Sequence, residues 1–296
     1  MLEPSGRLGV ILTLTAAVGF ALKTILAKLA YRHGIDPLTL LTLRLTVAGS
    51  VFASVLFYNV AVKKIWDLRF SARQWLTILA LAFFGYYLSA LLDFMGLVTV
   101  DANLGRMILF LYPTLVVLIN AFIAGQKVRA HVWAALVLCY GGVALMVLPN
   151  LVLSPGPGFA KGCLLIFSSA VAYAGYLVGV DRFFLTSNVV RFITVILTIS
   201  SLLVLVHFFA VRDPGLLVLP GEVYWLALLM GVFSTVIPCY AISAGIAMIG
   251  ASRASAISMI GPVVTLLMSV MILGESVGPL QIVGMVLIIV GVSRVR

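Results

Sequence analysis

Charged residues are scarce in this sequence. Asp, Glu, Lys and Arg make up only 9% of the 296 residues, whereas 63% of the residues are hydrophobic. A soluble domain carries about 25% charged residues, so this shortage excludes an ordinary soluble protein. We therefore interpret the chain as an integral membrane protein.

Cysteine and histidine are also rare, with three of each. Cys139, Cys163 and Cys239 lie in separate apolar runs, which favours small core side chains over a disulfide or metal framework. The histidines do not cluster in the sequence either. We therefore expect neither a bound metal ion nor a cofactor.

Motifs of common hydrolases and nucleotide-binding enzymes are absent as well. The sequence contains no H-E-x-x-H, G-x-S-x-G or P-loop segment, and no paired carboxylates or Ser/His/Asp set share one depth. We therefore do not expect an enzyme. Buried charges and tyrosines can still do chemistry inside a membrane, so an intramembrane enzyme remains the alternative from another functional class.

Long apolar runs are what the sequence has in abundance. They are close to the roughly 20 residues that a helix needs to cross a bilayer, and they are continuously apolar, which favours helices over a β-barrel. We expect the first run to stay as a span, because it is longer than the apolar region of a signal peptide. The predicted fold class is an all-α integral membrane protein with ten transmembrane helices. Their predicted bounds are 8–32, 37–60, 73–98, 101–123, 130–149, 159–182, 187–210, 222–248, 251–273 and 278–294.

Positive charges are unevenly divided between the two ends of these spans. Ten spans put both termini on one side, and that side carries twelve Lys and Arg residues against three on the other. Because such residues concentrate in the cytoplasm, we expect both termini there and the chain in a bacterial-type inner (plasma) membrane. The net charge of +10 then reflects contact with anionic lipid, and we expect no nucleic-acid partner. The twelve are Arg7, Lys63, Lys64, Arg69, Arg73, Lys127, Arg129, Arg182, Arg191, Arg253, Arg294 and Arg296; the three are Arg32, Lys161 and Arg212.

The two halves of the chain resemble each other. Residues 96–143 align without a gap onto 245–292 at an offset of 149, with twelve of 48 positions identical, including the pair Pro113 and Pro262. We therefore predict a first five-helix repeat at 1–148, a linker at 149–158 and a second five-helix repeat at 159–296. An odd number of spans per half makes the repeats inverted, which is the geometry of alternating-access carriers.

The segments "YPTLVVLINAFIAGQKV" and "GPVVTLLMSVMILGESV", each followed by a glycine-containing span, resemble the drug/metabolite transporter superfamily, specifically its EamA-type members. The "LRL" around Arg44 also matches the habit of that family. The resemblance covers essentially the whole chain and implies ten spans in two five-span halves. The family pattern has a Gly-Glu pair at the helix end, which this chain keeps at Gly274-Glu275 but changes to Gly125-Gln126 in the first copy. The resemblance leaves the substrate open, because relatives export amino acids, other metabolites and toxic compounds.

Four charged residues are predicted at a common depth within the spans. At about 1.5 Å of rise per residue, Lys23, Arg44, Asp93 and Arg106 fall roughly 7 to 14 Å below the external helix ends, so their side chains should point inward. Lys28 is shallower and is expected to extend outward. Asp93 either faces the substrate or pairs with Arg44 or Arg106, and Lys23 is then the cation left for a substrate carboxylate or phosphate.

Prolines and tyrosines within the spans complete the candidate site. Pro113 and Pro262 are expected to kink the fourth and ninth spans, either bordering the substrate path or only shaping the bundle, and Pro238 lies in the eighth. Tyrosines deep in spans indicate a partly polar chamber, with ordinary helix packing as the alternative. These are Tyr86, Tyr87, Tyr112, Tyr173, Tyr176 and Tyr240.

Together these features predict a secondary transporter that exports a small organic solute by alternating access, with aromatic or neutral amino acids as the first expectation. Its predicted partners are that small-molecule substrate and the lipid bilayer. A carrier or exchanger of phosphorylated or nucleotide-sugar solutes is the alternative within the transporter class, because the basic layer also suits it. Proton coupling and passive facilitation both stay open.

Overall fold

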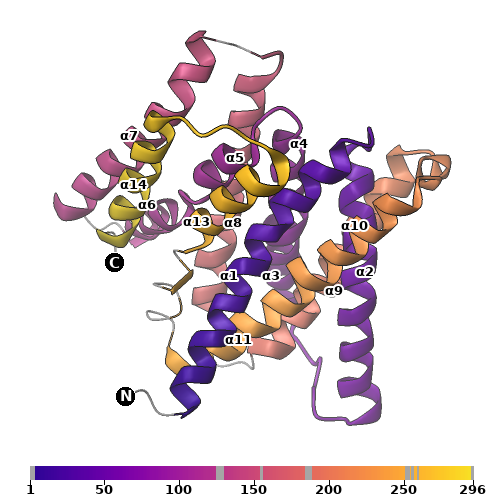
Figure 1. The fold of residues 1–296 in the computed structure, drawn as a ribbon. Coiled ribbons are helices and arrows are strands. Elements are labelled where there is room, and N and C mark those ends of the chain that lie inside the picture. Colours follow the sequence, from indigo (N-terminus) through magenta and orange to yellow (C-terminus); the bar gives the residue numbers. More distant parts are fainter. Residues whose placement is uncertain are drawn as a thin grey trace.

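The computed structural model describes residues 4–124, 130–153, 156–183, 189–250, 254, 257–258 and 260–294, and every regular element within these residues is a helix (Figure 1). The α-helices are α1 (Pro4–Tyr31), α2 (Pro37–Phe57), α3 (Ala72–Ala82), α4 (Ser89–Leu97), α5 (Ala102–Leu109), α6 (Tyr112–Ala124), α7 (Ala130–Leu153), α8 (Phe159–Phe183), α9 (Val189–Val211), α10 (Gly221–Gly231), α11 (Ile237–Ile249), α13 (Gly261–Met268) and α14 (Pro279–Arg294). The short η elements are η1 (Tyr58–Val62), η2 (Phe83–Leu88), η4 (Val232–Val236) and η5 (Ser269–Leu273), which are π-helical, and the 3₁₀ turn η3 (Pro214–Leu217).

Seven helical stretches of the described residues are long and apolar enough to cross a membrane. Three shorter apolar helices accompany them, at Trp133–Leu148, Gly261–Leu273 and Pro279–Arg294. The all-helical membrane fold is therefore as expected, whereas the count of ten spans stays a prediction. Helix α7 continues to Leu153, so the first residues of the predicted linker 149–158 are helical.

Helix ends in this bundle are set by local capping. Asp36 precedes Pro37 at the start of α2, and its carboxylate accepts hydrogen bonds from the backbone amides of Leu38 (3.1 Å) and Thr39 (3.3 Å). Ser71 and Gln74 form a reciprocal capping box at the start of α3. Such caps satisfy the amides that a helix leaves free at its first turn.

The helices pair in a pattern that repeats between the two halves. Helix α7 packs along α14, and α2 packs along α9, so corresponding helices of the two halves meet each other. Helix α1 packs on α11 and α13, and their counterparts make the matching contacts, α8 with α4 and α6. Figure 1 shows α7 and α14 side by side at one edge of the molecule. This exchange of contacts is what a two-fold related repeat produces.

Helix breaks occur at equivalent places in the two halves. Helix α5 ends at Leu109 and α6 begins at Tyr112, with Pro113 in its first turn; Pro262 has the same place in α13, which begins at Gly261. The π-helical segments η2 and η4 begin at residues 83 and 232, which is again an offset of 149. Pro238 directly follows η4, in the first turn of α11. At the expected kink of Pro113 the helix is interrupted at Phe110 and Leu111, and at that of Pro262 the residue before α13, Ile260, is a turn residue.

Some sequence predictions fall outside the described residues. They include the Gly125-Gln126 pair and the side chains of Lys127, Arg129, Arg182, Arg253 and Arg296.

Candidate functional site

The four charged residues predicted at one depth come together between the two halves. Lys23 lies on α1, Arg44 on α2, Asp93 on α4 and Arg106 on α5. The Lys23 amine lies 2.6 Å from a carboxylate oxygen of Asp93, and their side chains are only 13% and 3% exposed. Arg44 and Arg106 lie near enough to interact electrostatically with this pair. We call these four residues the charge layer.

The pairing within the charge layer differs from the expectation. Asp93 was expected either to face the substrate or to pair with Arg44 or Arg106, but it pairs with Lys23, so Lys23 is not the cation left over. Its role in substrate binding stays a prediction. The rise per residue predicts the depth of each residue along its helix. It does not predict the direction in which the side chain points about the helix axis.

Arg44 is buried and joins the first half to the second. Its Nε donates a hydrogen bond to the Thr235 hydroxyl at 2.9 Å, and its guanidinium lies 5.4 Å from the centre of the Phe94 ring. Thr235 lies in η4 and itself donates to the carbonyl of Met230 at 2.9 Å. The π-helical turn thereby aims a hydroxyl at the arginine, because its wider turn changes the direction of side chains.

Arg106 is the least satisfied member of the charge layer. Its Nε is buried and has no hydrogen-bond partner among the described residues. One of its terminal nitrogens lies 3.0 Å from the point where a Cβ on Gly261 would stand, so the missing side chain at Gly261 makes room for the guanidinium. In the described part of the chain no carboxylate lies within 4.0 Å of Arg44 or Arg106. After Lys23 and Asp93 neutralise each other, two cations remain.

Four of the predicted tyrosines form a continuous row beside Arg106. The ring centres of Tyr112 and Tyr173 lie 5.2 Å apart, those of Tyr173 and Tyr176 lie 5.7 Å apart, and those of Tyr176 and Tyr86 lie 5.4 Å apart. Arg106 interacts electrostatically with Tyr112 and Tyr173. We call these four residues the tyrosine row. It offers ring faces and hydroxyl groups next to a guanidinium with no carboxylate partner in the described part of the chain, which suits an aromatic or amphipathic solute with a carboxylate.

Tyr87 and Tyr240 do not join the tyrosine row. The Tyr87 hydroxyl lies 2.9 Å from Nδ1 of His207, and the Tyr240 hydroxyl lies 3.1 Å from the hydroxyl of Thr194. The Tyr240 ring also packs 5.4 Å from that of Phe52. Their predicted part in substrate binding is not tested by these contacts and stays a prediction.

The three prolines predicted within spans lie at the starts of α6, α13 and α11. Pro113 follows Tyr112, which interacts electrostatically with Arg106, and Pro262 follows Gly261, which lies against the Arg106 guanidinium. Pro238 lies against α1 instead, because a Cβ on Gly19 would stand 2.4 Å from its ring. Whether Pro113 and Pro262 border the substrate path stays a prediction, whereas Pro238 packs against Gly19 at the contact between α1 and α11.

Two charged residues near the helix ends, Lys28 and Glu275, make hydrogen bonds to backbone groups that the sequence did not predict. The Lys28 amine donates to the carbonyls of Leu97 (3.1 Å) and Val100 (3.0 Å), both near the predicted external end of the third span. Glu275, of the Gly-Glu pair, accepts hydrogen bonds from the amides of Ala102 (2.7 Å) and Asn103 (3.2 Å) and so caps α5 from the other half of the chain. The Gly-Glu pair was the available signal, but its partner lies more than 170 residues away.

The described residues offer no group of three or more His, Cys, Asp or Glu side chains that could hold a metal ion. Cys139 and Cys239 are buried, Cys163 is half-buried, and all three are free thiols. The site is therefore built from cations, phenols and one neutralised carboxylate.

Comparison with known proteins identifies the family. The sequence profile of the EamA-like transporter family matches the chain twice, over residues 7–148 and 160–295. In Bacillus subtilis (strain 168), "Uncharacterized transporter YcbK" is 31% identical over 290 residues, which cover 93% of this chain and 88% of that protein. "Uncharacterized transporter YyaM" of the same strain is 26% identical over 251 residues, which cover 84% of this chain and 81% of that protein. A solved crystal structure that is 20% identical has a TM-score of 0.65 over 97% of this chain and 96% of its own, so the fold is shared. The chain belongs to the EamA-like transporter family and is a multi-pass membrane transporter.

Proposed function

We propose that the protein exports a small carboxylate-bearing organic solute, an aromatic or neutral amino acid in the first place, across a bacterial-type inner membrane. The observation that carries this proposal is Arg106, whose buried Nε lacks an acceptor while its guanidinium lies beside the tyrosine row. A buried cation without an acceptor is costly in a membrane, and a substrate carboxylate would satisfy it. The rings of the tyrosine row would hold an apolar side chain of the same solute.

The two halves supply the means of alternating access in this proposal. The charge layer lies where α1, α2, α4 and α5 of the first half meet η4 and α13 of the second. Rocking of one half against the other would open this layer to each face in turn. The predicted orientation has both termini in the cytoplasm and the halves inverted.

Transport of phosphorylated or nucleotide-sugar solutes is the second candidate, favoured by one observation. The charge layer holds three cations and one carboxylate, an excess of two positive charges. A phosphate dianion would balance that excess, and guanidinium groups bind phosphate oxygens well.

Counterflow in proteoliposomes tests both candidates. Purified protein is reconstituted into vesicles loaded with unlabelled phenylalanine, leucine, glucose 6-phosphate or UDP-glucose, and uptake of the same labelled solute is followed. We expect counterflow of phenylalanine, whereas counterflow limited to the phosphorylated solutes would replace the proposal by the second candidate. Repeating the measurement with a pH gradient tells a proton-coupled carrier from a facilitator.

A variant connects the transport to the site. Arg106→Gln should lower phenylalanine counterflow about tenfold or more, because the hydrogen bonds to a charged group are lost. The matched control is Arg69→Gln, since Arg69 is 91% exposed outside the charge layer. Equal counterflow by both variants would remove Arg106 from the site.

A further inference from the structure

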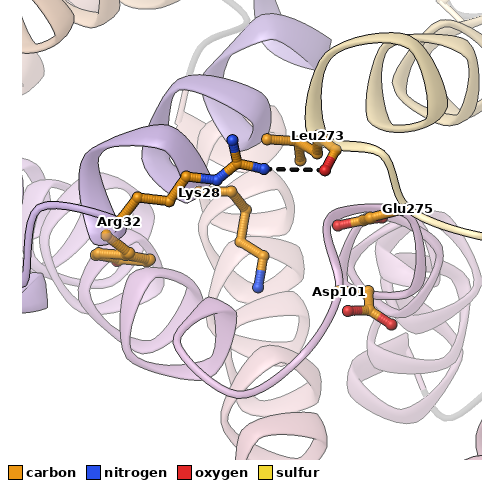
Figure 2. A pocket seen from close by; sticks show the side chains of 6 residues that line it. Lys28, Arg32, Asp101, Leu273 and Glu275 are labelled. Atoms are coloured by element: carbon orange, nitrogen blue, oxygen red, sulfur yellow. Dashed lines mark hydrogen bonds between the residues drawn. The ribbon is translucent and has the colours of Figure 1, made fainter.

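A pocket lies outside the charge layer, where three segments meet at one end of the bundle. Its volume is about 310 Å³, and it lies between the last turns of α1, the segment that leads into α5, and the segment that follows η5 (Figure 2). The lining residues are Lys28, Tyr31, Arg32, Asp101, Leu273 and Glu275. In the predicted orientation this is the external end.

Three of the four charges in this pocket are held by backbone groups. Lys28 is held by the carbonyls of Leu97, the last residue of α4, and Val100, and Glu275 caps α5, as described above. The Arg32 guanidinium donates one hydrogen bond, from Nη2 to the carbonyl of Leu273 at 2.9 Å, and Figure 2 shows this contact. Long side chains fixed in this way keep their charges facing one space at little further loss of freedom on binding.

The fourth charged residue, Asp101, is exposed, and its carboxylate accepts no hydrogen bond among the described residues. Its backbone starts α5, but its side chain makes no capping hydrogen bond, because Glu275 from the other half occupies that place. Among the described residues no hydrogen bond or ion pair joins the Asp101 carboxylate to another side chain, although Lys28 is near enough to interact with it electrostatically. Figure 2 shows Lys28, Asp101 and Glu275 around one space.

The four charges cancel, two cations against two carboxylates. Such a pocket suits a ligand that has no net charge but carries one positive and one negative group, which is a zwitterion. The volume of about 310 Å³ lies at the lower end of the roughly 300 to 1,000 Å³ typical of small-molecule pockets. A free amino acid is of that size and charge pattern.

We propose that this pocket is a second binding site, for zwitterionic amino acids, distinct from the charge layer. The solute ammonium binds the Asp101 carboxylate, and the solute carboxylate binds the guanidinium of Arg32 through the donors that Leu273 does not use. The site deepens the proposed function and rests on it for its place on the export path. It differs from the charge layer in net charge, because its two cations and two carboxylates cancel, whereas the charge layer has an excess of two positive charges.

Equilibrium binding of labelled phenylalanine to the purified full-length protein in detergent tests the proposal. We expect two sites per chain in the wild type, one in Arg106→Gln, one in Asp101→Asn, and none in the double variant. Loss of the ammonium–carboxylate contact should weaken the second site about tenfold or more. Two sites in Asp101→Asn, or no site in Arg106→Gln, would overturn the proposal, and so would a wild type that binds phenylalanine at one site or at none.

Analogues with one charge separate the two sites. Phenylpyruvate, which lacks the ammonium group, should compete at the charge layer of Asp101→Asn but not at the pocket of Arg106→Gln. Glu222→Gln is the matched control, because Glu222 is 77% exposed at the same end and faces His33. Counterflow distinguishes failure of the second site from failure of the proposed function. Counterflow of phenylalanine by a protein that binds it at only one site would refute only the second site. Binding of phenylalanine without counterflow would refute the export function.

Discussion

A Cβ on Gly142 would stand 2.6 Å from the carbonyl oxygen of Gly284, and a Cβ on Gly284 would stand 2.6 Å from the carbonyl oxygen of Gly142. The backbones of α7 and α14 therefore touch at this point. At the repeat offset of 149, the matching contact is Gly291 with the carbonyl of Ala135, at 2.8 Å. Both contacts follow from small residues, which allow close approach of helices in a membrane.

Gly142→Val should accordingly destabilise the protein, whereas its neighbour Gly141 provides a matched control. A side chain at Gly142 collides with backbone, and overpacking of this kind costs about 1 to 3 kcal/mol. A Cβ on Gly141 meets nothing within 4 Å. We expect Gly142→Val to lower the melting temperature and folded yield in detergent and Gly141→Val to leave both near the wild type. Equal melting temperatures would contradict the close contact.

The ion pair between Lys23 and Asp93 gives a second prediction. Removing one partner leaves the other charge buried, which costs about 3 to 5 kcal/mol, so Lys23→Met and Asp93→Leu should each lower folded yield. The double variant should recover much of that yield, because two apolar side chains need no partner. Size-exclusion profiles and melting temperatures of the three variants decide this, and a double variant as unstable as the sum of the singles would speak against direct pairing.

Much of this fold follows from the sequence, because apolarity in lipid and helix-breaking residues are local signals. The outer bounds of most helical stretches and the proximity of Lys23 and Arg106 were predicted from run length and punctuation, whereas the breaks at η2 and η4 were not. These features depend on the position of a residue along its own helix, and the rise per residue fixes that position.

The contacts between helices could not be predicted from the sequence. Asp93 pairs with Lys23, and Lys28 binds two carbonyls of the first half about 70 residues away, because each helix is rotated by its packing against neighbours far away in the chain. Tyr240 is drawn to Thr194 for the same reason. The capping role of Glu275 needed the position of α5, which no local pattern contains.

That cap supplies a third prediction. Glu275→Ala removes both acceptors from the first turn of α5, so we expect a loss of about 1 kcal/mol of stability, whereas Glu275→Gln keeps one amide oxygen and should lose less. Melting temperatures measured in detergent should decrease in the order wild type, Glu275→Gln, Glu275→Ala. Ser276→Ala, at the next position in the chain, is the control. An alanine variant as stable as the wild type would mean that water replaces the carboxylate at no cost.

The fourth prediction concerns the room that Gly261 leaves for Arg106. A methyl group at Gly261 would stand 3.0 Å from a terminal nitrogen of Arg106, which is closer than ordinary contact, so Gly261→Ala should displace the guanidinium while leaving the helix able to form. If Arg106 binds the substrate carboxylate, the KM for phenylalanine in counterflow should rise severalfold. Gly278→Ala is the matched control, because a Cβ there meets nothing within 4 Å. Unchanged KM in Gly261→Ala, with a melting temperature equal to that of the control, would show that the position of the guanidinium does not matter to transport.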